Sequence, residues 1–364
     1  MNPPIITEQQ ILDALHPIVD PDFHKSIVDL GFVKNIAING SDVSFSIELT
    51  TPACPVKEEF QNDAHARVSA LAGVENVAVD MTAQERPTPG SVETTREDVL
   101  PGVHRVIAVA SGKGGVGKST TAINLALALQ KAGARVGVMD CDVYGPSLPL
   151  LTGTHGRPQT EGKKIIPLEG HGLKLMSIGF FTDDDSPVIW RGPMVHGLIK
   201  QFLTDVLWGE LDYLILDMPP GTGDAALTLT QNAPLSGAVI VTTANDLSLI
   251  DARKGLAMFQ KVEIPVLGII ENLSFFTPPD LPDRKYYIFG EGGGKRVAEN
   301  LGVDFLGEIP IDPQVVSDGD LGKPIVLSQP DSIAAQSFIE LASQVTRKLS
   351  KVEAEKAGAA AKSA

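Results

Sequence analysis

The stretch Ser111-Gly112-Lys113-Gly114-Gly115-Val116-Gly117-Lys118-Ser119-Thr120 decides the fold. It satisfies the phosphate-loop spacing G-x-x-x-x-G-K-[ST], in which glycine-rich backbone curls around phosphate oxygens. An apolar run at 106–110 precedes it, and apolar residues at helical spacing follow it. Strand, loop and helix in this order predict the first unit of a doubly wound α/β sheet with a bound nucleotide. The competing interpretation is a glycine-rich turn without a ligand.

Each residue type in the loop has a physical reason to be there. Backbone N–H groups and the start of the following helix favour an anion. Lys118 is expected to neutralise the β- and γ-phosphates of ATP, and the Ser119 hydroxyl is expected to bind Mg²⁺. The residues predicted to hold the nucleotide are Gly112, Gly114, Gly115, Val116, Gly117, Lys118, Ser119 and Thr120.

Carboxylates follow two further strand-like runs. Asp140-Cys141-Asp142 ends one run, and Asp217 closes the apolar run at 213–216, as in a Walker B motif. Because carboxyl ends of parallel strands face the ligand crevice, carboxylates at these positions can act on Mg²⁺ or on the attacking water, and Asp217 is predicted to do so. Asp140 is either a third such group or the cap of a loop or helix.

Asn272 follows the strand-like run 266–270 and is the candidate for reading a purine base, since its amide both donates and accepts hydrogen bonds. The alternative is an Asn that only forms a turn.

Short, continuous apolar runs alternate with amphipathic helical patterns after residue 103, which predicts a mostly parallel sheet covered on both faces. Before it, one helix at 8–19, strands at 33–38 and 43–49, a helix at 57–72 and a strand at 74–79 predict a small α/β domain. The last helix is expected at about 332–349. We therefore expect a small α/β domain at 1–82, a Pro- and Gly-containing linker at 83–102, the P-loop domain at 103–350 and a flexible tail at 351–364.

Composition excludes several classes of protein. The chain of 364 residues has a formal net charge of −15, which argues against a broad surface for nucleic acid or anionic membrane. Its apolar runs are far shorter than the roughly 20 residues of a membrane-spanning helix. The N-terminus lacks the pattern of a secretory signal, so a cytoplasmic location is expected. Two cysteines, Cys54 and Cys141, exclude a four-thiolate site within one chain.

The second lysine of the loop, Lys113, makes the sequence resemble the deviant Walker A family, which includes MinD, ParA, the nitrogenase iron protein and the Mrp/ApbC cluster carriers. In that family the extra lysine reaches the phosphates of the partner chain. The resemblance therefore implies a catalytic role for Lys113, together with Lys118, in an ATP-dependent homodimer. It also favours Asp142 over Asp140 as the residue that acts on Mg²⁺ or on the attacking water.

Three further segments resemble the Mrp/ApbC iron–sulfur carriers specifically. They are Asp142-Val143-Tyr144-Gly145-Pro146-Ser147, Trp190-Arg191-Gly192-Pro193-Met194 and Asp217-Met218-Pro219-Pro220-Gly221-Thr222-Gly223-Asp224. The N-terminal segment Leu49-Thr50-Thr51-Pro52-Ala53-Cys54-Pro55 resembles the small cluster-assembly domain that is often fused ahead of these ATPases. By that resemblance Cys54 is the functional thiol and a ligand of an iron–sulfur cluster. A buried, inert cysteine is the alternative.

One departure from the family pattern concerns the cargo. Carriers of this type have a C-x-x-C pair that lets two chains bridge a 4Fe–4S cluster, whereas residues 274–280 contain no cysteine. The resemblance implies an ATP-hydrolysing carrier that transfers clusters to apoprotein clients and works with iron–sulfur assembly proteins. Two alternatives stay open: a positioning ATPase like MinD or ParA, and an adaptor ATPase that binds no cluster.

Overall fold

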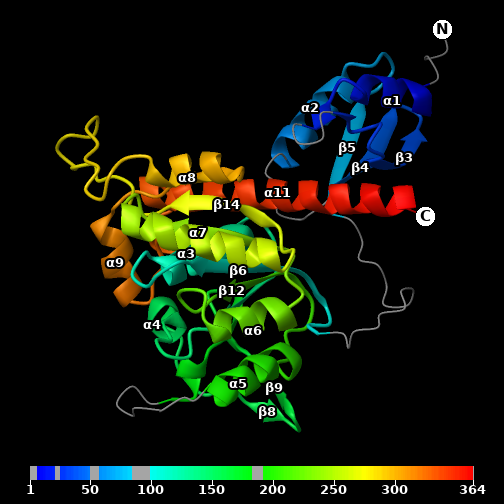
Figure 1. Ribbon diagram of the computed structural model, residues 1–364. Helices are drawn as coiled ribbons and strands as arrows, with labels where there is room; N and C mark the ends of the chain where they lie inside the picture. The colour runs from blue at the N-terminus through cyan, green and yellow to red at the C-terminus, as the bar shows by residue number, and fades with distance from the viewer. Residues whose placement is uncertain (1–5, 21–24, 50–56, 84–98, 183–191, 364) are drawn as a thin grey trace. The chain divides into compact units, whose positions relative to one another are not determined.

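The computed structural model describes residues 6–20, 25–49, 57–83, 99–182 and 192–363 (Figure 1). Residue contacts divide the chain into two units, one comprising Met1–Val92 with Thr346–Ala364 and the other Glu93–Val345. Each unit has its own hydrophobic core. Within the described residues, every helix is too short or too polar to pass through a lipid bilayer.

The first unit has a small α/β fold, as predicted. Its core lies between two helices and a three-stranded sheet of order β3-β4-β5. Strand β4 pairs antiparallel with β3 and parallel with β5. Thr7 caps the first helix in a capping box with Gln10. The elements are α1 (Glu8–Leu15), β1 (Val19–Asp20), β2 (Lys25–Ser26), β3 (Val33–Asn39), β4 (Asp42–Leu49), α2 (Lys57–Ser69) and β5 (Asn76–Ala83).

The second unit is built on an eight-stranded sheet of order β10-β11-β7-β12-β6-β13-β14-β15. All neighbouring pairs are parallel except β10 with β11. The strands β7, β12 and β13 are buried at every position, because helices cover both faces of the sheet. The strands are β6 (Val103–Ser111), β7 (Val136–Asp140), β10 (Leu168–Gly170), β11 (Leu173–Met176), β12 (Leu211–Asp217), β13 (Gly237–Thr242), β14 (Val266–Glu271) and β15 (Phe305–Glu308).

Helices and short connecting elements complete the second unit. Helix α3 packs against β6, β7 and β12, while α7 and α8 lie beside β14 (Figure 1). A separate hairpin of β8 and β9, which the sequence does not predict, follows α4. The elements are α3 (Lys118–Lys131), α4 (Leu148–Thr152), β8 (Thr160–Glu161), β9 (Lys164–Ile165), the 3₁₀ helix η1 (Ile178–Phe180), α5 (Gly192–Thr204), α6 (Asp224–Asn232), α7 (Asp246–Lys261), α8 (Gly293–Leu301), α9 (Pro313–Asp320) and α10 (Ile325–Ser328).

The C-terminal helix α11 (Ile333–Ser363) runs further than the sequence predicts. The sequence analysis ends this helix near Leu349 and expects a flexible tail at 351–364. The expected tail is helical through Ser363 instead. Its residues are rich in Ala, Lys and Glu, which have high helix propensity and continue a helix without an apolar face.

Strand order places the candidate site. Strand β6 lies between β12 and β13, so the chain winds outward in both directions from the centre of the sheet. In open α/β sheets the ligand crevice lies beyond the carboxyl ends of the strands at this switch point. Loops that follow β6, β7, β12 and β14 carry the predicted site residues to this edge.

Candidate functional site

The loop between β6 and α3 has the backbone conformation of an anion cradle. Gly115 and Gly117 adopt φ values of 82° and 80°, in the left-handed region that favours glycine. Gly117 is the N-cap of α3, and no side chain caps this helix end. The first N–H groups of α3 are therefore available to phosphate oxygens.

Lys118 and Asp217 form a buried ion pair at the centre of the site. The Lys118 ammonium contacts the Asp217 carboxylate and also donates to the Ser119 hydroxyl at 3.2 Å. The two charged residues are 7% and 3% exposed. Burial raises the pKa of Asp217, and the charge of Lys118 opposes this rise. Two motifs that lie 99 residues apart in sequence thus meet.

The oxygens next to this ion pair fit a magnesium ion. The Lys118 ammonium contacts both the Ser119 hydroxyl and the Asp217 carboxylate, so a hydroxyl and a carboxylate lie around one ammonium at the start of α3. Mg²⁺ prefers such hard oxygen ligands and completes its shell with water and phosphate oxygens. The residues present therefore fit a nucleotide-bound Mg²⁺.

Asp140 holds a loop rather than facing a ligand. Its Oδ1 accepts the Asp142 N–H at 3.0 Å, and its Oδ2 accepts the N–H groups of Ser147 and Leu148 at 3.0 and 3.2 Å. The Ser177 hydroxyl donates to the same Oδ2 at 3.0 Å. Burial raises the pKa of Asp140 to about 7, with a further contribution from the negative charge of Asp217. Of the two sequence interpretations, the structure supports the cap.

Asp142 lies at the start of the loop that Asp140 holds. Its Oδ1 accepts the Gly145 N–H at 3.2 Å, and the residue is half-buried. It borders a cavity of about 310 Å³, whose other walls include Pro219 from the loop after β12 and Asp224 at the start of α6. Its charge contributes to the raised pKa of Asp217. Asp142 is therefore near enough to the ion pair to act on its charge, and it lines this cavity.

The loop after β12 is joined to the phosphate loop through backbone contacts. The Gly221 N–H donates to the Ser111 carbonyl at 3.0 Å. Gly221 has φ of 82°, which favours glycine at this close approach. A ligand that moves one loop will therefore affect the other.

Asn272 supports the phosphate loop in this structure. Its amide donates to the Val116 carbonyl at 2.8 Å, and a Cβ on Gly117 would lie 2.1 Å from the amide nitrogen. Its backbone N–H donates to Thr242. The neighbouring Glu271 is fully buried and accepts the Gly294 N–H at 2.6 Å. The structure thus gives Asn272 a positioning contact, and base recognition stays a prediction.

Lys113 is placed differently from Lys118. It is half-buried, and its carbonyl accepts the Ser111 hydroxyl at 2.9 Å. Among the described residues, its ammonium has no hydrogen-bond or ion-pair partner. This arrangement is compatible with a lysine that acts on another chain.

Of the two cysteines, the structure describes Cys141. Cys141 is 1% exposed, and burial raises its pKa well above the ordinary value of a thiol. It therefore has the character of a buried hydrophobe. Cys54 lies outside the described residues. Within the part of the chain that the structure describes, no group of three or more His, Cys, Asp or Glu side chains is arranged to hold a metal ion.

Aromatic residues pack in the segment 274–280, which contains no cysteine. Phe275 is 6% exposed, and the Lys285 ammonium lies 3.8 Å from the centre of its ring. Phe276 pairs through its backbone with Tyr286 and Ile311. The segment is an ordered, packed part of the second unit without thiols.

Sequence reasoning missed two supporting residues. Ser177 anchors to Asp140 across 37 residues of sequence, and Asn124 accepts the Val326 N–H while donating to the Thr120 carbonyl. Both are buried polar side chains. The only sequence signal was a polar residue inside an otherwise apolar run.

Comparison with family models assigns both parts of the chain. The model of the NUBPL iron-transfer P-loop NTPases matches residues 102–346, and that of iron–sulfur cluster assembly proteins matches residues 8–80. These matches cover the two predicted domains and most of the chain.

Individual relatives agree with the family models. The chain is 48% identical to an iron–sulfur cluster carrier protein of Synechocystis, over 95% of this chain and 99% of the relative. It is 45% identical to the mouse iron–sulfur cluster transfer protein NUBPL, over 77% and 87% of the two chains. Among solved structures, a nucleotide-binding protein of Archaeoglobus fulgidus in complex with ADP shares 40% identity with a TM-score of 0.56, covering 62% of this chain and 89% of that one.

Proposed function

Because the chain belongs to the family of NUBPL iron-transfer P-loop NTPases, we propose that it carries iron–sulfur clusters to apoproteins under the control of ATP. One observation carries the proposal. A phosphate loop with its lysine and carboxylate already in contact lies in a chain that matches an iron–sulfur cluster carrier protein over almost its whole length. We place this activity in the cytoplasm.

In this proposal the second unit binds and hydrolyses ATP. The N–H groups at the start of α3 and the Lys118 ammonium bind the phosphates, and Ser119 and Asp217 hold the Mg²⁺. Bound Mg²⁺ supplies charge neutralisation of the β- and γ-phosphates. Asp142 orients the attacking water. The oxygen of this water bonds to the γ-phosphorus as the bond between that phosphorus and the β–γ bridging oxygen breaks, which yields ADP and phosphate.

Hydrolysis in this proposal needs a second chain. The Lys113 ammonium, which has no partner among the described residues, contacts the phosphates bound by the other protomer of a homodimer. Since a cation near the γ-phosphate stabilises the developing charge, the dimer hydrolyses ATP and the monomer does not. The nucleotide state then controls how the two chains are held.

The cargo is bound by thiolates, of which each chain has few. Because Cys141 is buried with a raised pKa and residues 274–280 contain no cysteine, Cys54 from each of two chains is the proposed ligand. Two thiolates do not supply ligands to every iron atom of a cluster, so residues of a client can bind the other iron atoms. Such an arrangement suits a cluster that is passed on. If no cluster is retained, the adaptor ATPase becomes the better description.

Cluster transfer to an apo-ferredoxin tests the proposal. The wild-type chain, loaded anaerobically, is expected to restore the visible absorption of the ferredoxin, and ATP is expected to change the rate. A Lys118→Ala chain should transfer without this ATP dependence. Absence of transfer, with co-sedimentation of the chain on lipid vesicles or DNA in ATP, would contradict the carrier and favour a positioning ATPase.

A further inference from the structure

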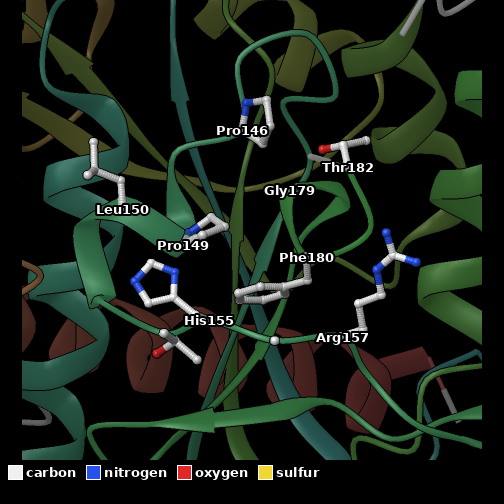
Figure 2. A pocket seen from close by; sticks show the side chains of 10 residues that line it. Pro146, Pro149, Leu150, His155, Arg157, Gly179, Phe180 and Thr182 are labelled. Atoms are coloured by element: carbon white, nitrogen blue, oxygen red, sulfur yellow. The ribbon is translucent and has the colours of Figure 1, made fainter. Parts of the chain in front are cut away.

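Buried carboxylates hold loops on both sides of β6 in the sheet. Asp140, at the end of β7, fixes the loop whose Pro146 and Pro149 line a cavity of about 470 Å³ beside α4 (Figure 2). Glu271, at the end of β14, is also fully buried but is not used by the proposed ATP chemistry. A buried carboxylate needs hydrogen bonds to offset the loss of its hydration. The groups that Glu271 contacts are therefore held in place.

Each carboxylate oxygen of Glu271 accepts a hydrogen bond from a different end of the same segment. Oε1 accepts the Ser274 hydroxyl and Oε2 accepts the Gly294 N–H, both at 2.6 Å. Gly294 lies in the first turn of α8, whose positive end favours the carboxylate. A Cβ on Gly294 would lie 3.1 Å from Glu271 Oε2, so the approach is close. Glu271 therefore ties the start of the segment 274–294 to its end.

The residue that follows Asn272 has a strained backbone. Leu273 has φ of 54°, in the left-handed region that is unfavourable for a residue with a Cβ. Such a conformation persists only where the surrounding structure holds it. Two hydrogen bonds of Ser274 do so here: its N–H donates to the Ile309 carbonyl at 3.0 Å, and its hydroxyl donates to Glu271.

The turn at Leu273 determines where the Asn272 side chain lies. Asn272 is buried, and its amide donates to the Val116 carbonyl of the phosphate loop at 2.8 Å. Val116 precedes Gly117, the N-cap of α3, so this contact fixes the backbone directly ahead of the N–H groups that are proposed to bind phosphate. A chain of contacts therefore runs from Glu271 through the strained turn to the phosphate loop.

We propose that Glu271 and Ser274 are positioning residues of the nucleotide site, and that they act through Asn272. Their hydrogen bond holds Leu273 in its left-handed conformation and so keeps the Asn272 amide on the phosphate loop. Because this conformation is unfavourable for leucine, the turn relaxes when the hydrogen bond is lost, and the Asn272 amide moves with it. The inference rests on the nucleotide binding of the proposed function and not on its cluster.

Isothermal titration of the full-length chain with ADP tests the proposal. Ser274→Ala, which removes only the hydroxyl, should weaken ADP binding by about three- to tenfold. Glu271→Ala should weaken it by at least as much. Glu271→Gln should restore most of the affinity, because a Gln side chain can accept from the Gly294 N–H and donate to the Ser274 oxygen.

Double variants distinguish positioning from a general loss of packing. Asn272→Ala with Ser274→Ala should bind ADP no more weakly than Asn272→Ala alone, since Ser274 acts through Asn272. Leu273→Asn should restore most of the affinity that Ser274→Ala loses, because asparagine adopts the left-handed conformation more readily. Glu263→Asn is the matched control in the same background. Glu263 also has a positive φ, of 59°, but it is exposed beyond the end of α7.

Three results would overturn the inference. The first is additive losses in Asn272→Ala and Ser274→Ala, which would mean that Ser274 acts independently of Asn272. The second is a Ser274→Ala chain with the ADP affinity of wild type. The third is equal recovery with Leu273→Asn and Glu263→Asn. Melting of each variant shows whether it is folded, and if Glu271→Ala is not, the Ser274 variants decide the question.

Cluster retention by the same proteins separates this inference from the proposed function. A wild-type chain that binds ADP more tightly than Ser274→Ala but retains no cluster contradicts only the carrier function. A wild-type chain that retains a cluster and binds ADP no more tightly than Ser274→Ala contradicts only the positioning by Glu271 and Ser274.

Discussion

The Lys118 ammonium contacts the Asp217 carboxylate inside the protein, so the cation of the phosphate loop belongs to a buried ion pair. Both side chains are almost fully buried. Removing one member of such a pair leaves an uncompensated buried charge. Nucleotide and Mg²⁺ must therefore replace this contact with new ones.

Lys118→Ala should abolish ATP binding and hydrolysis and also destabilise the second unit. Loss of one partner from a buried ion pair costs about 3–5 kcal/mol, or a fall in Tm of roughly 10 °C. Calorimetric melting and a phosphate-release assay measure the two effects. Lys113→Ala is the control: it should stop hydrolysis but leave Tm nearly unchanged, since its ammonium has no partner among the described residues. Retained turnover in Lys118→Ala would refute the site.

Asn272→Ala should weaken ADP binding by about five- to tenfold, because the Val116 carbonyl of the phosphate loop loses its donor. Gly117→Ala should weaken it further, through both the positive φ and the close approach to Asn272. Gly133→Ala separates these causes, since Gly133 has φ of 98° but open space around it. Isothermal titration with ADP measures all three. An unchanged affinity in Asn272→Ala would show that the contact does not position the loop.

Asp140→Asn should become more stable relative to wild type as the pH rises from about 5 to 8. The pKa of Asp140 is about 7 in the folded protein and about 3.9 in an unfolded chain. Between these values the folded state holds a proton that the unfolded state has released, so the free energy of unfolding of wild type falls with rising pH. The Asn side chain does not ionise and escapes this loss.

Melting of both proteins without nucleotide at several pH values measures this effect, at about 2–4 °C per kcal/mol. Titrations that the two proteins share cancel in the difference of their Tm values. A difference that stays constant with pH, or that changes in the opposite direction, would contradict the raised pKa of Asp140.

Cys141 should resist alkylation in the folded protein even at pH 8.5. The thiolate is the reactive form, and burial both raises the pKa of Cys141 and blocks access. Mass spectrometry of a Cys54→Ser chain after iodoacetamide should show label only when denaturant is present. Rapid labelling without denaturant would mean that the end of β7 opens readily.

Sequence patterns predicted the strands, loops and helices that are determined by residues close together in the sequence. Continuous apolar runs gave the buried parallel strands, and the spacing of the phosphate loop placed Lys118 and Ser119 at the start of α3. The pattern at Asp217 placed it at the end of a neighbouring strand. Such signals are readable because strand burial and phosphate binding restrict residue types at fixed spacing.

Features that depend on distant contacts were not predictable in the same way. The anchoring of Ser177 to Asp140 depends on the pairing of β11 with β7, and the support of Val116 by Asn272 joins residues 156 apart. The predicted end of the last helix, near residue 349, was wrong for a different reason: the segment after it is helical. It lacks an apolar stripe, yet its Ala, Lys and Glu residues continue α11 through intrinsic helix propensity.

Anaerobic reconstitution with ferrous iron and sulfide, followed by gel filtration and assay of bound iron and sulfide, tests the central claim most directly. The wild-type chain should retain both as a dimer, Cys54→Ser should retain neither, and Cys141→Ala should retain as much as wild type. Wild type without bound iron and sulfide, or Cys54→Ser with as much as wild type, would contradict a cluster carrier that works through Cys54.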